Sequence, residues 1–145
     1  MELEKQVCSL ELAKRLKERG VKQESFFYWQ AGMLFAQGDY AGETAVHGEY
    51  AGPKFWTKTD ASVSAFTVAE LGEMLPTRIE RDGETYWLYS SRSNVDFNVG
   101  HAYAEQGLTY LAQYEELTEA DARAKMLIYL IENRLTEVPI QSVTK

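Results

Sequence analysis

Apolar positions recur at helical spacing in three segments of the chain. In the first segment Leu12, Ala13 and Leu16 share one face, while charged residues occupy the other. Ser9 precedes this segment as a good N-cap, and Gly20 follows it in the position just past a helix end. The pattern therefore predicts a helix over residues 10–19.

The second helical segment, "FTVAELGEMLP", has the clearest start signal in the chain. Thr67 and Glu70 have the spacing of a capping box, and Pro76 is expected to end the helix. Gly72 lies inside the segment, where glycine costs about 1 kcal/mol relative to alanine. Its missing side chain would allow another backbone to approach closely.

The third segment, "TEADARAKMLIYLIENRL", predicts a helix that begins at Thr118, with Asp121 as the reciprocal capping residue. Ile128 falls among polar positions, so it is expected to be exposed and could mark a partner contact. The expected core stripe is Ala120, Ala124, Leu127, Leu130 and Ile131. The expected i,i+4 ion pairs are Glu119 with Arg123 and Asp121 with Lys125.

Aromatic and β-branched residues mark the strands. Four consecutive aromatic residues in "ESFFYWQ" favour a strand covered on both faces, and "MLFAQ" is expected to form a second one. "TRIERDGETYWLYSS" predicts a β-hairpin around a type I′ turn at Asp82 and Gly83. That turn sets the opposing residues, Arg81 with Glu84 and Ile79 with Tyr86. The polar stretch 90–107 is predicted as a loop, and "LTYLAQYE" as a further strand.

Helices and strands in this order do not alternate as βαβ units would. We therefore expect an α+β fold, with a mostly antiparallel sheet and about three helices packed on one of its faces. At 145 residues the chain is expected to form a single domain over 1–145, with a Gly/Tyr-rich excursion at about 38–56 and a frayed tail from about 136.

Charge and composition narrow the function classes. The formal net charge of −7 makes nucleic acid an unlikely partner, because such binding relies on neutralising phosphates. The basic residues of the first helix, among them Lys14 and Arg15, are read as a solvated face. No apolar run is long enough for a signal peptide or a membrane span, so cytoplasmic localisation without membrane contact is expected.

Motifs for nucleotide binding, structural zinc and serine hydrolysis are absent from the sequence. His47 and His101 lie among acids, including Asp39 and Asp96, but no spacing supports a metal or acid–base site. Cys8 precedes a helix N-cap, where a thiolate would be favoured, although such a cysteine more often packs as a small apolar residue. We expect no catalytic residue, no metal and no cofactor.

The unit Gly-Asp/Glu-Tyr-Ala-Gly occurs twice between residues 38 and 52. Tyr40 and Tyr50 take equivalent places in it, so their rings could flank one groove and stack on a ligand. Trp56, His47 and the anion-binding Arg92 are the other residues expected to bind the ligand. The alternative is a turn-rich connection in which the two tyrosines cover the edge of a sheet.

Three segments, "VCSLELAKRLKERGVKQESFFYWQ", "AFTVAELGEMLP" and "TEADARAKMLIYLIENRL", together resemble a family of small uncharacterised proteins of bacteriophages and prophages. The resemblance covers about a third of the chain and excludes the Gly/Tyr-rich excursion. It implies a phage or mobile-element origin and action in the cytoplasm of a bacterial host. It brings no catalytic residue.

The sequence thus favours a non-enzymatic, phage-type accessory binding protein, a monomer or homodimer, that captures a host protein or a small metabolite or nucleotide. Interference with host defence is one version of this role. Two alternatives remain: a small enzyme with a histidine–acid site in the loops, and a DNA-binding regulator that uses the basic first helix.

Overall fold

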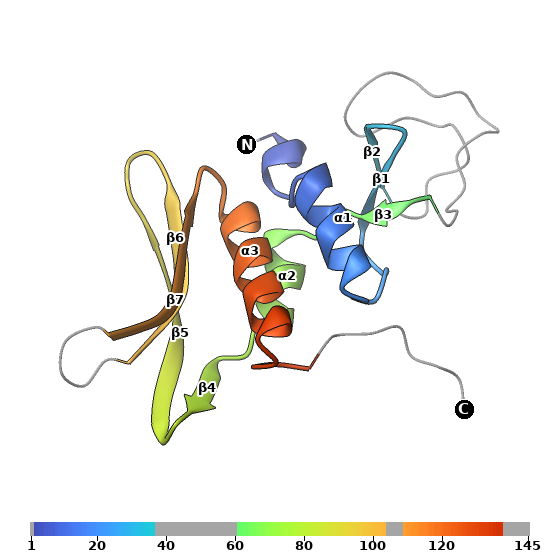
Figure 1. Ribbon diagram of the computed structural model, residues 1–145. Helices are drawn as coiled ribbons and strands as arrows, with labels where there is room; N and C mark the ends of the chain where they lie inside the picture. The colour runs from blue at the N-terminus through green and yellow to red at the C-terminus, as the bar shows by residue number, and fades with distance from the viewer. Residues whose placement is uncertain (1, 37–60, 104–108, 138–145) are drawn as a thin grey trace, which may run out of the picture.

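The structure, a computed structural model, describes residues 2–36, 61–103 and 109–137 (Figure 1). Within these residues it has a 3₁₀ turn, three helices and seven strands. In chain order they are η1 (Leu3–Lys5), α1 (Leu10–Glu18), β1 (Phe27–Gln30), β2 (Met33–Ala36), β3 (Val63–Ser64), α2 (Val68–Met74), β4 (Arg78–Arg81), β5 (Glu84–Arg92), β6 (Phe97–Tyr103), β7 (Thr109–Glu116) and α3 (Glu119–Glu132).

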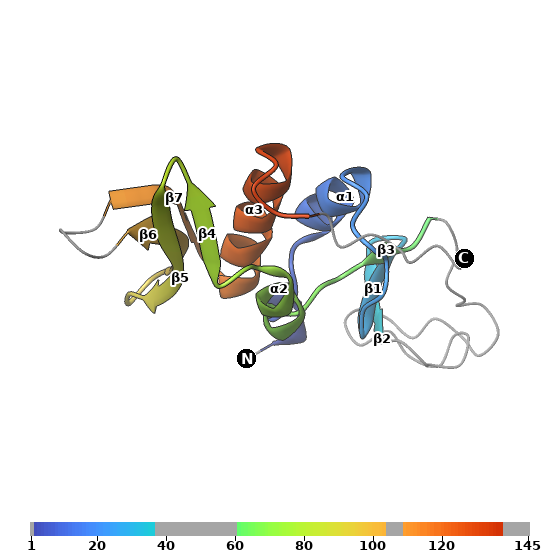
Figure 2. The same cartoon turned by 90° about the horizontal axis from the view of Figure 1, so that it is seen from below.

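The predicted α+β class is confirmed, but the strands form two antiparallel sheets instead of one. The smaller sheet has the order β2-β1-β3 and the larger has the order β4-β5-β6-β7. The helices lie between the two sheets, with α3 against the larger sheet and α1 near the smaller one (Figures 1 and 2). The division arises because the chain enters α2 directly after β3 and then starts a new hairpin.

Helix α3 is the centre of the molecule, which corrects the expectation for Ile128. Its side chain is only 2% exposed, and Ala122, which the expected core stripe does not include, is fully buried. One side of α3 packs on β6 and β7, and other sides meet α1 and α2. A helix enclosed in this way is apolar around most of its circumference, so its polar positions do not mark a solvent face.

The helix ends follow local chemistry. Gly20 lies just past the end of α1, as predicted, with φ of 86°. The amides of Gly20 and Val21 donate to the carbonyl groups of Lys17 and Leu16, which makes this end a Schellman motif. The capping box at α2 is also confirmed, since the Thr67 side chain accepts from the Glu70 amide and the Glu70 carboxylate from the Thr67 amide.

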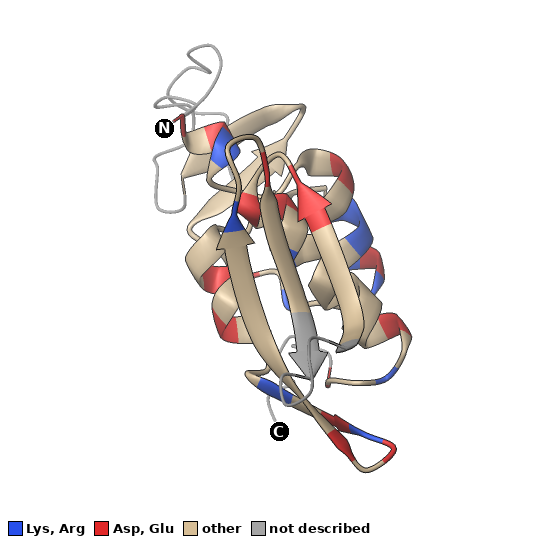
Figure 3. Ribbon diagram, turned by 90° about the vertical axis from the view of Figure 1, so that its left-hand side faces the viewer, with Lys and Arg blue, Asp and Glu red and all other residues tan. Residues whose placement is uncertain are grey.

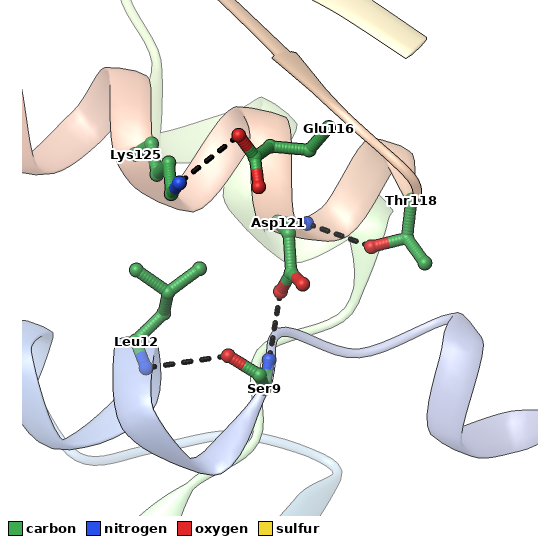
Figure 4. A network of polar contacts seen from close by, with 6 residues as sticks. All are labelled: Ser9, Leu12, Glu116, Thr118, Asp121 and Lys125. Atoms are coloured by element: carbon green, nitrogen blue, oxygen red, sulfur yellow. Dashed lines mark hydrogen bonds and ion pairs between the residues drawn. The ribbon is translucent and has the colours of Figure 1, made fainter. Parts of the chain in front are cut away.

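The cap of α3 differs from the expectation at one residue. Thr118 accepts from the Asp121 amide as predicted, but the Asp121 carboxylate accepts from the Ser9 amide at 2.8 Å (Figure 4). Lys125 consequently pairs with Glu116 at 3.0 Å and not with Asp121. The expected pair of Glu119 and Arg123 is present, at 2.6 Å.

The hairpin of β4 and β5 has the predicted register, and Asp82 and Gly83 both have positive φ, as a type I′ turn requires. The predicted loop over 90–107 is wrong, because residues 97–103 form β6 in the middle of the larger sheet. Phe97 and Val99 alternate there with Asn98 and Gly100, a period-two pattern that the abundance of turn-forming residues obscured.

Strand β1 has buried clusters on both faces, as its aromatic run predicted. Tyr28 packs with Phe35 on one face, whereas Phe27 and Trp29 pack with Leu34 on the other. The β1–β2 hairpin turns at Ala31 and Gly32, both with positive φ. The Gly/Tyr-rich excursion connects β2 to β3, and it lies outside the described residues, as does the chain beyond residue 137.

Candidate functional site: an open aromatic sheet face

The larger sheet covers α3 with one face, and none of the described elements covers its other face, which we call the open face. Figure 3 looks onto this open face, with the helices behind the strands. Tyr86 and Leu88 of β5 pack against the main core on the covered side. Because neighbouring residues of a strand point to opposite faces, Trp87 and Tyr89 lie on the open side. Trp87 is 52% exposed.

The strand register arranges the open face in rows. One row runs across all four strands, from Arg78 through Trp87 and Ala102 to Tyr110. Trp87 and Tyr110 therefore lie two strands apart, with the small residue Ala102 between them in the ladder. The next row holds Tyr89, Gly100 and Gln113.

A register shift in β7 brings Tyr110 to the open face. His101 pairs with Ala112, but the next residue of β6, Ala102, pairs with Tyr110, so Leu111 is an extra residue in β7. Leu111 and Ala112 both pack against the core, whereas Tyr110 is 44% exposed. If the pairing continued regularly from Ala112, Leu111 would lie on the open side and Tyr110 on the covered side. Such bulges commonly re-aim a side chain near a functional site.

Tyr89 and Tyr110 form a tilted pair on this face. Their ring centroids are 5.7 Å apart and their planes are inclined by 47°. The Tyr89 ring lies over Gly100, where a Cβ atom would come within 3.0 Å of it and within 2.5 Å of the Ala112 carbonyl oxygen. Glycine at position 100 thus permits both the close strand contact and the position of the ring. We call Trp87, Tyr89 and Tyr110 the aromatic face.

Glu115 gives the aromatic face a negative border. Its carboxylate accepts hydrogen bonds from the side-chain amides of Asn98, at 3.3 Å, and Gln113, at 3.4 Å. In the described part of the chain no cationic side chain lies within ion-pair distance of it. Burial, Tyr110 and Glu115 raise the pKa of Tyr89 to about 12, which keeps its hydroxyl neutral. The face therefore offers hydroxyl and amide groups for hydrogen bonds, and no described cation offsets the charge of Glu115 beside them.

Of the residues predicted to bind a ligand, Tyr40, His47, Tyr50 and Trp56 lie outside the described residues, so their grouping stays a prediction. Arg92 is exposed at the end of β5, with its guanidinium carbon 5.2 Å from the centroid of the Phe97 ring. It pairs with Phe97, in the row that points to the covered side of the sheet, so the structure does not group it with the aromatic face.

Of the candidate catalytic groups, His47 and the side chain of His101 lie outside the described residues, so the histidine–acid site stays a prediction. Cys8 is fully buried, and that burial raises the pKa of its thiol to about 12, so it packs as an apolar residue. Asp96 accepts a hydrogen bond from the Ser93 hydroxyl at 2.6 Å in the β5–β6 turn. Searching the described ranges finds no group of three histidine, cysteine or acidic side chains able to hold a metal.

Internal contacts occupy several basic residues of the first helix and its end. The ammonium of Lys17 donates to the Ser62 carbonyl at 3.0 Å, Arg19 pairs with Glu132, and Lys22 pairs with Glu24 at 3.1 Å. These contacts leave fewer cations available for phosphates than the sequence suggests.

Sequence reasoning placed Trp87 and Tyr89 in the correct hairpin but did not consider the face they occupy. Their i,i+2 spacing in a strand was a usable signal, because it puts both rings on one side. The position of Tyr110 was hidden, since it depends on the extra residue Leu111. Gly100 lies in the stretch that was predicted as a loop, so its position beneath the Tyr89 ring was not anticipated.

Comparisons of the chain with protein-family models, with curated proteins and with solved structures found no match. Among the described helices, the longest of which is α3, none has the length and apolar character needed to cross a bilayer.

Proposed function

We propose that the protein is a non-enzymatic binding protein of phage type that acts in the cytoplasm of a bacterial host, and that the aromatic face is its capture surface. The observation that carries the proposal is the exposed position of Trp87 and Tyr110 on a sheet face that no described element covers. Large aromatic side chains left in water cost stability, and they are typical of binding surfaces.

The construction of the face supports binding over catalysis. An interrupted strand ladder at Leu111 turns Tyr110 outward, and a glycine at position 100 makes room for Tyr89. Both features place aromatic side chains where a ligand can contact them. No described side chain on this face pairs with a base in the way that a nucleophile requires.

The origin and the biological role rest on the resemblance to phage and prophage proteins. A small phage protein with a capture surface and no catalytic group would act by occupying a host protein or a metabolite, and interference with host defence is one such action. The Gly/Tyr-rich excursion, with Tyr40 and Tyr50, is the second candidate surface.

Native mass spectrometry of the protein purified from bacterial cells tests the proposal. We expect a co-purifying mass that is lost in Trp87→Ala and retained in Phe26→Ala, a matched exposed aromatic residue that directly precedes β1 of the smaller sheet. Loss in Tyr40→Ala with Tyr50→Ala instead would move the surface to the excursion. Turnover of a co-purifying molecule, abolished by a single substitution, would contradict a non-enzymatic role.

A further inference from the structure

We propose that the aromatic face binds a proline-rich segment of a partner protein, in polyproline II conformation, with a lysine or arginine next to the prolines. This inference rests on the proposed function and specifies the chemistry of the ligand. The supporting observations are the spacing of Trp87 and Tyr110, the orientation of the two tyrosine rings, and the charge of Glu115.

The spacing of the outer rings matches the repeat of a polyproline II helix. Trp87 and Tyr110 lie in one row, two strands apart, with Ala102 between them. Neighbouring strands are about 4.8 Å apart, so two steps span about 9.6 Å. A polyproline II helix rises about 3.1 Å per residue, so prolines three residues apart repeat at about 9.3 Å on one side. One proline can therefore pack on each ring, above the small residue between them.

The orientation of the tyrosines favours a ridged ligand over a flat one. A sugar ring or a nucleobase stacks best on a ring plane that is parallel to it. Tyr89 and Tyr110 are inclined by 47°, so together they form a ridge beside the row and not a flat platform. A proline side chain is compact, so the prolines that pack on Trp87 and Tyr110 need no flat platform. Aromatic-lined grooves of this kind are a recurring way to hold proline-rich segments.

Polar groups on the face suit a backbone without internal hydrogen bonds. The carbonyl groups of a polyproline II helix remain available as acceptors. The Tyr89 hydroxyl already donates to Asn98 at 3.4 Å. The Trp87 indole, the Tyr110 hydroxyl and the second amide hydrogen of Gln113 can donate hydrogen bonds on the same face. The ligand needs no donor of its own at the proline positions.

Charge selects the residue beside the prolines. Arg78 lies 3.9 Å from Glu80 and offsets its charge, whereas the partners of Glu115 among the described residues are the amide groups of Asn98 and Gln113. The carboxylate of Glu115 is therefore an unbalanced charge on the Tyr89 side of the face, in the row that follows Tyr89 along the strands. It attracts a cation and, together with the net charge of −7, repels phosphates. A basic flank complements this border, and a nucleic acid does not.

Fluorescence anisotropy with a labelled decapeptide tests the inference. The peptide carries prolines at positions i and i+3 followed by two lysines, and its two controls replace the prolines by alanines or the lysines by glutamates. We expect binding by the full-length protein to weaken about tenfold or more in Trp87→Ala, as for an aromatic hot spot. Phe26→Ala should bind like the unchanged protein, and far-UV circular dichroism should verify the fold of each variant.

Glu115→Gln separates charge from shape. We expect it to weaken the lysine peptide about two- to fivefold, the range of an exposed ion pair, without affecting a peptide that lacks the lysines. Alanine in place of the prolines should abolish the difference between the unchanged protein and Trp87→Ala. Equal binding of the proline and alanine peptides would overturn the inference.

The same assay distinguishes the two proposals. If the proline peptide does not bind, but cellohexaose, an oligothymidylate or a co-purifying host protein binds in a Trp87-dependent manner, the aromatic face remains a capture surface and the proline-rich ligand is wrong. If Trp87→Ala changes neither peptide binding nor co-purification, both proposals fail.

Discussion

Asp121 links two helices through a single carboxylate. It stands in the first turn of α3 and accepts a hydrogen bond from the backbone of Ser9, the N-cap of α1 (Figure 4). Asp121→Ala leaves that partly buried amide without a partner, so we expect it to lower the free energy of unfolding by about 1–2 kcal/mol. Asp121→Asn keeps an acceptor oxygen, and urea unfolding at pH 7 should place it close to the unchanged protein.

The hydrogen bond of Asp121 stabilises the fold, whereas the burial of its negative charge lowers stability. Burial, followed in the same direction by Glu116, raises the pKa of the carboxyl above 3.8 in the folded protein. Its protonated form is therefore favoured by folding, and this contribution is present below pH 3.8 and is lost as the pH rises through the folded pKa. As the pH is lowered from 7 to 4, the unchanged protein gains this contribution and Asp121→Asn does not. The free energy of unfolding of Asp121→Asn relative to the unchanged protein should therefore decrease over that range. An increase would contradict this assignment.

The thiol of Cys8 is expected to react only when the protein opens. Burial raises its pKa from 9.0 to about 12, which lowers the thiolate fraction at pH 8 on the order of a thousandfold. Ellman's reagent at pH 8 should label the folded protein slowly, at a rate that follows unfolding as urea is added. Fast labelling in the absence of urea would contradict the burial of the thiol.

Alkaline pH gives a second measurement of the same group. Because the folded pKa of Cys8 is the higher one, its contribution to stability is present below pH 9 and is lost as the pH rises toward 12. Cys8→Ala should remove part of this loss. The remainder belongs to Tyr89 and Tyr114, whose pKa values are also raised, chiefly by burial.

At the scale of elements, Gly72 of α2 receives a side chain from α3. A Cβ atom at position 72 would lie 2.1 Å from Nη1 of Arg123, which donates to the Val68 carbonyl and pairs with Glu119. The sequence suggested a close backbone, but the neighbour is this guanidinium. We expect Gly72→Ala to destabilise the protein by about 1 kcal/mol, because the displaced contacts outweigh the helix propensity gained.

A double-mutant cycle tests this contact. In an Arg123→Met background, which retains the packing of the side-chain stem, Gly72→Ala should stabilise the protein by about 0.5–1 kcal/mol through helix propensity alone. The two substitutions should therefore couple by about 1–2 kcal/mol in urea unfolding. Additive effects of the two substitutions would show that the Arg123 guanidinium does not occupy the space beside Gly72.

Elements defined by local chemistry were predictable from the sequence, and those defined by distant contacts were not. The Schellman ending at Gly20, the capping box at Thr67 and the turn at Asp82 each depend on a few neighbouring residues. The burial of Ile128 depends on elements that surround α3 on several sides, and the exposure of Tyr110 depends on an extra residue relative to β6. Neither leaves a periodic signal in its own segment.

At the scale of the molecule, the layers determine which surface is free for binding. The helices between the two sheets are covered on both sides, so the amphipathic faces that the sequence displays are used internally (Figure 2). The open face of the larger sheet remains, and it carries the aromatic face (Figure 3). A binding surface on strands loses little conformational entropy when a ligand binds.

One core joins both sheets, and we therefore expect them to unfold together. A single buried cluster contains residues of β3, of all three helices and of the larger sheet; its members include Val63, Leu16, Leu71, Leu127, Ile79 and Val99. The indole of Trp29 in the smaller sheet also donates to the Cys8 carbonyl at 3.1 Å, ahead of α1. The smaller sheet also has two small clusters of its own, one around Tyr28 and one around Leu34. Trp29 packs against both the main cluster and the cluster of Leu34, and this link favours an all-or-none transition.

Two single-tryptophan variants report on the two sheets separately. Trp56→Phe with Trp87→Phe retains Trp29, and Trp29→Phe with Trp56→Phe retains Trp87. Within each variant, fluorescence and circular dichroism at 222 nm should give the same urea midpoint, even though the loss of the Trp29 hydrogen bond lowers the midpoint of the second. A smaller sheet that melts at lower urea than the circular dichroism signal would divide the molecule into two units. The aromatic face would then belong to a domain that folds without residues 27–36.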